Sequence, residues 1–106
     1  MNGFQITFFT RQDRRHAGKP MGEWLLGLIK AQGLRGASLH SGGESFGPDR
    51  RVHSAHFFEL ADQPIEVLVA ATADETTRLF DALIAEKVHL FYVKTAVEYG
   101  VLGVDP

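Results

Sequence analysis

A glycine-rich segment that ends in two arginines, SGGESFGPDRR from Ser41 to Arg51, has the residue types that bind an anion. Glycine reaches positive φ and lets backbone N–H groups approach phosphate oxygens closely, and arginine adds paired hydrogen bonds. The candidate anion-binding residues of this loop are Gly42, Gly43, Gly47, Arg50 and Arg51. The loop is neither a Walker loop nor a dinucleotide-binding fingerprint, and a plain hairpin connection is the alternative interpretation.

Lys19 is a further candidate for anion binding, because it lies in a Gly-Lys-Pro triplet directly before an expected helix. The start of a helix presents unpaired N–H groups to an anion, although Pro20 removes one of these donors. A solvated lysine at the end of a loop is the alternative interpretation.

Five histidines raise the hypothesis of a metal site. His53 and His56 form an H-x-x-H pair, but they lie in an expected strand, where positions three apart point to opposite faces. His40 and His53 could meet across the loop, with Glu44 or Asp49 as an oxygen ligand. Nothing in the spacing requires this arrangement, so the sequence predicts no metal ligands and no cofactor.

The residues from Gly43 to Gly47 match the pattern G-x-S-x-G of a hydrolase nucleophile elbow. Such an elbow needs a strand before the serine and a helix after it, whereas a loop and a strand are expected around Ser45. The chain is also too short for that hydrolase fold. We therefore expect a protein that is not an enzyme.

Size and composition limit the class of protein. A chain of 106 residues suits one domain, 1–106, which buries roughly 60 to 70% of its unfolded surface. A net charge of −2 with 11 Lys and Arg argues against binding of nucleic acid. The absence of cysteine excludes disulfides and thiolate metal sites. Without a secretory signal pattern or a run of about 20 apolar residues, the chain is expected to be cytoplasmic and not itself transmembrane.

Apolar periodicity predicts seven elements in the order β, α, β, β, β, α, β. The expected strands cover residues 4–9, 37–40, 52–60, 65–71 and 88–97, and residues 10–19 are expected to form a loop. The first helix is expected to have Pro20 in its first turn and Gly33 just after its end. The second is expected to start with Asp74 as N-cap and to continue to Lys87.

This order of elements predicts an α+β, ferredoxin-like split βαβ sandwich, an antiparallel sheet with two helices on one face. The other face of the sheet would then carry Phe57, Leu68 and either Phe91 or Tyr92. The apolar run from Ile65 to Ala71 is typical of a strand buried on both faces or at a subunit interface. A monomer would expose these side chains to water, so self-association through the sheet is expected.

The run from Gly18 to Val69 resembles a family of small PII-like proteins of unknown function. The shared features are Gly18-Lys19-Pro20 before the first helix, Gly33-Leu34 and Gly36-Ala37 around the second strand, Phe46-Gly47 in the loop, Arg51-Val52-His53, and the turn from Leu60 to Pro64. With the first strand and the C-terminal helix and strand included, the resemblance covers nearly the whole chain.

The resemblance implies a single PII-like domain, similar to the PII signal proteins and the CutA ion-tolerance proteins, which both assemble as trimers. In PII proteins an adenine nucleotide lies between subunits, near the base of a partner-contacting loop whose counterpart here is 41–51. Phe46 matches the phenylalanine-glycine of that loop. Lys87 is the cation that this chain keeps where PII proteins have a second phosphate loop.

The expected function is therefore that of a homotrimeric PII-like regulatory protein. It would bind a small anion, for example an adenine nucleotide, at a subunit cleft, and a partner protein through loop 41–51. The alternative is a CutA-like divalent-metal-binding protein that uses His40, His53 or His56.

Overall fold

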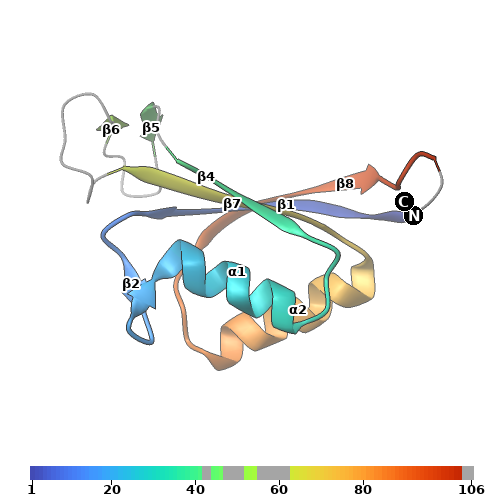
Figure 1. Cartoon of the computed structure of the whole chain (residues 1–106), viewed down its shortest axis with the longest axis horizontal. Helices are drawn as coiled ribbons and strands as arrows, with labels where there is room; N and C mark the ends of the chain where they lie inside the picture. The colour runs from blue at the N-terminus through green and yellow to red at the C-terminus, as the bar shows by residue number, and fades with distance from the viewer. Residues whose placement is uncertain (42–43, 47–51, 55–62, 104–106) are drawn as a thin grey trace.

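The main body of the protein is a four-stranded antiparallel sheet with two helices on one face (Figure 1). The structure, a computed structural model, describes residues 1–41, 44–46, 52–54 and 63–103. The strand order is β4-β7-β1-β8. The elements are β1 (Asn2–Arg11), α1 (Met21–Ala31), β4 (Ala37–Ser41), β7 (Pro64–Ala71), α2 (Ala73–Ala85) and β8 (Phe91–Glu98). This arrangement confirms the predicted α+β, ferredoxin-like fold.

Two small hairpins flank the sheet: the first lies where a loop was expected, and the second joins part of the expected loop 41–51 to the start of the expected strand 52–60. The first pairs β2 (Arg15–His16) with β3 (Lys19–Pro20), and its turn contains Ala17 and Gly18 at φ of 53° and 79°. The second pairs β5 (Glu44–Phe46) with β6 (Val52–Ser54). The prediction of a plain loop at 10–19 was wrong, because β1 continues to Arg11 and the Ala-Gly turn lets the chain pair with itself.

The core lies between the sheet and the helices, as the apolar stripes predicted. Alternate residues of β1 and β7 point to the helices, among them Ile6 and Val67, which are both 0% exposed. Gly22 lets α1 pack closely on the sheet, because a Cβ atom there would lie 2.8 Å from the Leu39 side chain. The buried apolar side chains are Ile6, Phe8, Met21, Leu25, Ile29, Leu34, Ile65, Val67, Val69, Ala71, Leu79 and Leu83.

The helix starts differ from the predictions by one or two residues. Pro20 occupies the N-cap of α1 rather than its first turn. The N-cap of α2 is Thr72, and Asp74 lies in the first turn. Thr72 is favoured because the Glu75 N–H donates to its Oγ1 at 3.2 Å, while its own N–H donates to Glu75 Oε1 at 2.8 Å. This reciprocal capping box satisfies two N–H groups, where Asp74 as N-cap would have been a single acceptor.

The face of the sheet away from the helices is partly apolar. Strand register places Leu68, Phe91 and Val93 on this open face, since their neighbours on each strand point to the helices. Phe91 and Val93 are 46% and 47% exposed. Tyr92 instead lies on the helix side, with its ring centroid 4.9 Å from that of Phe80. Phe57, which was expected on the open face, lies outside the described residues.

Besides shifts of one or two residues at the ends of β1, β4 and β7, the limits of two predicted strands differ more clearly in the structure. The last strand begins at Phe91, three residues later than expected, and β6 covers Val52–Ser54 of the predicted 52–60, of which residues 55–60 lie outside the described part. On β7 the helix-facing side chains are buried, whereas Glu66 on the other face is exposed and Leu68 is half-buried, so the strand is not buried on both faces within one subunit; its place at a subunit interface stays a prediction. No helix in the described residues is long and apolar enough to cross a membrane.

Candidate functional site

The β2–β3 hairpin and the end of α2 are joined by a hydrogen bond between side chains far apart in the sequence. His16 Nε2 lies 2.9 Å from Glu86 Oε1, and the two residues are 70 positions apart. The His16 side chain is 23% exposed and that of Glu86 is 49% exposed. The hairpin is therefore attached to the second helix at the surface of the molecule.

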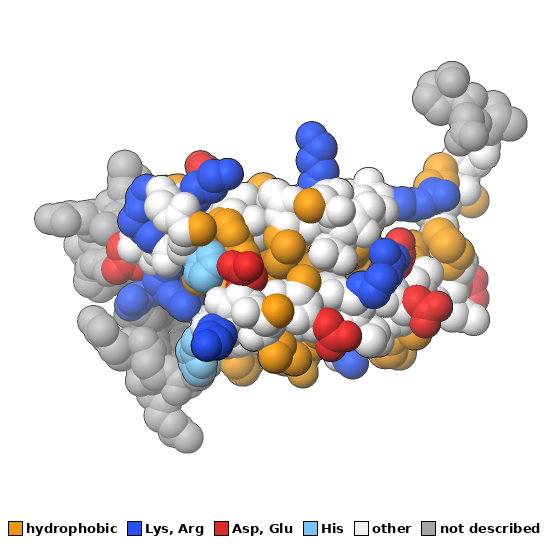
Figure 2. Space-filling view, turned by 90° about the horizontal axis from the view of Figure 1, so that it is seen from below, with side chains coloured by type: hydrophobic (Ala, Val, Ile, Leu, Met, Phe, Trp, Pro, Cys, Tyr) orange, Lys and Arg blue, Asp and Glu red, His pale blue; other side chains and the backbone are white. Residues whose placement is uncertain are grey.

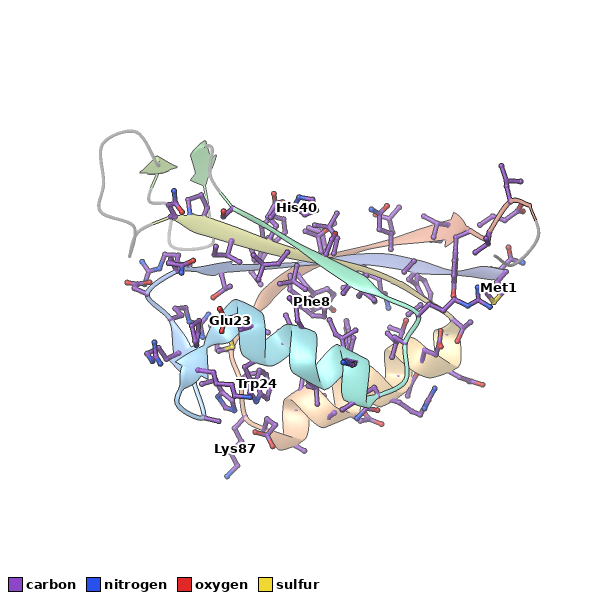
Figure 3. All side chains as sticks on the ribbon, in the orientation of Figure 1. Met1, Phe8, Glu23, Trp24, His40 and Lys87 are labelled. Atoms are coloured by element: carbon purple, nitrogen blue, oxygen red, sulfur yellow. The ribbon has the colours of Figure 1, made fainter. Side chains whose placement is uncertain are left out.

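The same histidine contacts the first helix. The ring centroids of His16 and Trp24 are 4.2 Å apart, with the ring planes tilted by 58°. Figure 3 shows Trp24 at the start of α1 and Lys87 below it, at the end of α2. His16 thus connects three elements, the hairpin, α1 and α2; we call His16, Trp24 and Glu86 the His16 cluster.

Two lysines that were predicted to bind an anion lie next to residues of the His16 cluster. Lys19 is directly opposite His16 in the hairpin register, and Lys87 follows Glu86 in the chain. Both lysines are exposed. Arg15 Nη2 donates to the Gly18 carbonyl at 2.7 Å and so closes the turn that carries Lys19. The fold therefore places these two cations, which are distant in the sequence, on two elements that contact each other.

Lys87 has an unusual backbone conformation for its residue type. The two helices end alike: the N–H of Gln32 donates to Leu28 O and that of Glu86 to Ala82 O, and a residue with positive φ follows each. After α1 that residue is Gly33, as predicted, at φ 79°. After α2 it is Lys87, at φ 58°. Glycine is strongly favoured at this position because it has no Cβ to clash.

The short strands β5 and β6, which flank part of the loop predicted for anion binding, lie at the same end of the molecule (Figure 1). Figure 1 shows β5 and β6 at the end of the sheet that also carries β2, and Figure 2 shows Lys and Arg side chains gathered at that end. Phe46 lies in β5, with its backbone opposite Val52. Gly42, Gly43, Gly47, Arg50 and Arg51 lie outside the described residues.

Sequence reasoning did not find the His16 cluster. No spacing rule links residues 16, 24 and 86, since their contacts depend on how the hairpin packs between the helices. A partial signal was available in His16-Ala17-Gly18-Lys19, because a two-residue connection that contains glycine is typical of a tight hairpin. That signal would have placed His16 opposite Lys19.

The histidines proposed as metal ligands are not gathered in the described part of the chain. Among these residues no group of three or more His, Asp or Glu side chains could hold a metal ion. His40 Nε2 lies 2.9 Å from Ser38 Oγ, and the register places His40 opposite Glu66 on the open face. The backbone of His53 lies in β6, opposite Ser45, and His56 lies outside the described residues.

Two hollows of the described surface lie away from the lysines. One, of about 530 Å³, is open and lies on the open face between the ends of β4 and β8, where Ser38, Ala70 and Val97 form part of its lining. The other, of about 250 Å³, is apolar and lies between α2 and β8, lined by residues such as Phe80 and Leu90. Lys19 and Lys87 project from the surface outside both hollows.

Solved structures with a similar fold include PII-like proteins. CPII of Thiomonas intermedia K12, a nitrogen regulatory PII-like protein bound to ADP, AMP and bicarbonate, superposes with a TM-score of 0.69 at 12% identity, over 95% of this chain and 91% of that chain. A candidate PII-like signalling protein of Thermus thermophilus gives 0.61 at 13% identity, over 91% and 85%. At identities this low, the similarity shows the fold alone, and the ligand has to be argued from other observations.

Comparison at the sequence level gives a family. None of the curated proteins matches the chain. The family model DUF190, described as "Uncharacterized ACR", matches residues 3–98 and so includes both helices and all four strands of the main sheet. The chain, a small protein with a PII-like fold, belongs to the DUF190 family.

Proposed function

We propose that this protein is a homotrimeric PII-like regulatory protein that binds a small phosphate-bearing anion, such as ADP, at a cleft between subunits. Lys19 and Lys87 contact the anion from one subunit, with loop 41–51 beside them. Binding orders that loop for a partner protein. Loop residues Gly42, Gly43, Phe46, Gly47, Arg50 and Arg51 complete the proposed ligand contacts.

The observation that carries this proposal is the lysine in left-handed conformation after α2. A non-glycine residue in that conformation costs roughly 1 to 2 kcal/mol, and such strain is concentrated at functional sites. Lys87 lies at the exposed end of α2, and its neighbour Glu86 contacts the hairpin that presents Lys19. Two exposed lysines on adjacent elements supply the positive charge that a phosphate group needs.

The similar structures support the choice of ligand class. CPII is bound to ADP, AMP and bicarbonate, and all three are anions. Its fold matches that of this chain across nearly its whole length. We therefore choose ADP and bicarbonate as the first ligands to test on this protein.

The exposed apolar side chains of the open face support the proposal of a trimer. Phe91 and Val93 are about half exposed on that face in a single subunit, next to the half-buried Leu68. Monomeric proteins rarely leave contiguous apolar patches open to water. Covering by other copies of the chain would remove these side chains from water and create the clefts between subunits.

Isothermal titration calorimetry with ADP tests the ligand. We expect micromolar binding by the wild-type protein, and at least tenfold weaker binding by Lys87→Ala, because loss of a hydrogen bond to a charged group costs about 1.5 to 3 kcal/mol. Lys30→Ala, an exposed lysine in the last turn of α1, is the matched control and should bind like wild type. Equal affinities for Lys87→Ala and Lys30→Ala would contradict the assignment of Lys87.

The same samples test whether the protein acts by binding alone. We expect ADP to remain intact after prolonged incubation with the protein, as measured by ion-exchange chromatography. Release of AMP or adenosine above the rate in buffer would show an enzyme and contradict this part of the proposal.

A further inference from the structure

We propose that His16 is a proton-sensitive positioning residue that controls anion binding at Lys19 and Lys87. The inference rests on the proposed function, since it concerns regulation of the same site. When protonated, His16 holds the hairpin to α2 through Glu86 and to α1 through Trp24. When neutral, it holds the hairpin less firmly, and the two lysines are less well positioned for an anion.

Both contacts of His16, with Glu86 and with Trp24, become stronger when its imidazole ring is protonated. Histidine is the side chain whose charge changes between about pH 5 and 8. A protonated His16 donates a charge-assisted hydrogen bond to the Glu86 carboxylate at 2.9 Å, and such bonds are roughly twice as strong as neutral ones. A cation next to an indole ring, here with 4.2 Å between ring centroids, gains a further attraction.

The electrostatic surroundings of His16 are mixed in sign. Charged residues at the adjoining ends of these elements are Arg14, Arg15 and Lys19 in and before the hairpin, Glu23 in the first turn of α1, and Glu86 and Lys87 at the end of α2; Lys30 of α1 and Asp74, Glu75, Arg78 and Asp81 of α2 lie farther along the helices. Glu86 is the acidic partner in direct contact with His16. Protonation therefore strengthens the attachment to α2 and also adds positive charge beside Lys19, and both effects favour a bound anion.

The backbone at this point supports a functional role for the arrangement. The non-glycine residues with positive φ among the described residues are Ala17 and Lys87. Each directly follows one member of the hydrogen-bonded pair, since Ala17 follows His16 and Lys87 follows Glu86. A residue in a disfavoured backbone conformation thus follows each side of the contact between His16 and Glu86. Such strain is concentrated at functional sites, which supports a functional role for this contact.

Trp24 allows the protonation of His16 to be followed without any ligand. It is the single tryptophan of the chain, and an imidazolium quenches indole fluorescence more strongly than a neutral imidazole. We expect the emission of the wild-type protein to fall as the pH is lowered from 8.0 to 5.5. The transition should be absent from His16→Gln, which keeps a hydrogen-bond donor but cannot take up a proton.

ADP affinity is then measured by calorimetry at pH 5.5 and pH 8.0 for wild type, His16→Gln, Glu86→Gln and the control His40→Gln. The comparison with His16→Gln at each pH cancels the titration of ADP itself. We expect wild type to bind about two- to fivefold more tightly than His16→Gln at pH 5.5, a factor typical of exposed ion pairs, and equally at pH 8.0. Glu86→Gln should lose the advantage and His40→Gln, whose histidine contacts Ser38 instead, should keep it.

The outcomes separate the two proposals. A fluorescence transition that depends on His16, together with equal ADP affinities of wild type and His16→Gln at both pH values, would overturn the control by His16 and leave the proposed function intact. Lack of ADP binding by every variant would contradict the proposed function, and with it the regulation. The fluorescence would still report whether the His16 cluster forms.

Discussion

At the scale of single residues, the lysine at position 87 lowers the stability of the fold but places a positive charge at the end of α2. The backbone there is left-handed, at φ 58°, a conformation that suits glycine. Gly33 occupies the equivalent position after α1. The chain thus uses the favourable residue at one helix end and a charged residue at the other, which we attribute to the anion site.

Lys87→Gly should therefore stabilise the protein while it weakens ligand binding. We expect the free energy of unfolding to rise by about 1 kcal/mol, since relief of the left-handed strain is partly offset by the greater backbone entropy of glycine. ADP affinity should fall as it does in Lys87→Ala. Urea unfolding followed by circular dichroism measures the first effect. The reverse change at the end of α1, Gly33→Lys, should lower the free energy of unfolding by a similar amount. A Lys87→Gly protein that is less stable than wild type would contradict the claim that the backbone at Lys87 is strained.

At the scale of secondary-structure elements, caps and turns decide where each helix begins and ends. The capping box of Thr72 and Glu75 starts α2 directly after β7. A short connection of this kind fixes the direction in which α2 crosses the sheet. The far end of α2, with Glu86 and Lys87, is thereby directed toward the β2–β3 hairpin.

Thr72→Ala tests the contribution of this cap. We expect a loss of about 1 kcal/mol in the free energy of unfolding, because the Glu75 N–H loses its acceptor in a partly buried setting. Thermal unfolding by calorimetry measures the change. Thr77→Ala is the matched control: the Thr77 hydroxyl donates to Ala73 O within the exposed surface of α2, and its removal should change stability by less than about 0.5 kcal/mol.

At the scale of the whole molecule, the two faces of the sheet have different partners. The helices cover the centre of one face, where Ile6, Val67 and Ala71 are all 0% exposed. The open face has no such cover within the described part of one chain, and β8 remains largely exposed along its length. This asymmetry is the physical reason to expect assembly.

Sedimentation equilibrium tests the assembly. We expect a mass of three times the 11.7 kDa of one chain and a shift toward the monomer for Val93→Arg, which places a charge in the apolar part of the open face. Ala31→Arg, at the exposed end of α1 in the helix layer, should sediment like wild type. A monomeric wild-type protein at micromolar concentration would contradict assembly through this face.

Periodic patterns in the sequence were sufficient for the fold class, the two helices and the strands of the main sheet. Apolar residues that repeat every two or three to four positions reflect burial on one face, and such burial is a local property of an element. Gly33 was predicted correctly for the same reason, since a helix end depends on adjacent residues. The N-cap of α2 was predicted at Asp74 instead of Thr72 because the advantage of Thr72 comes from its reciprocal hydrogen bonds with Glu75, three residues later.

The candidate site depends on contacts that no local pattern encodes. Lys19 and Lys87 were predicted separately, one from a helix start and the other from a resemblance, and nothing in their spacing indicated that they share one end of the molecule. His16 and Glu86 meet across 70 residues because the hairpin packs where α1 and α2 come together on the sheet. Local burial and turn chemistry thus suffice for the elements of this protein, whereas the neighbours of its charged groups are set by the way those elements pack.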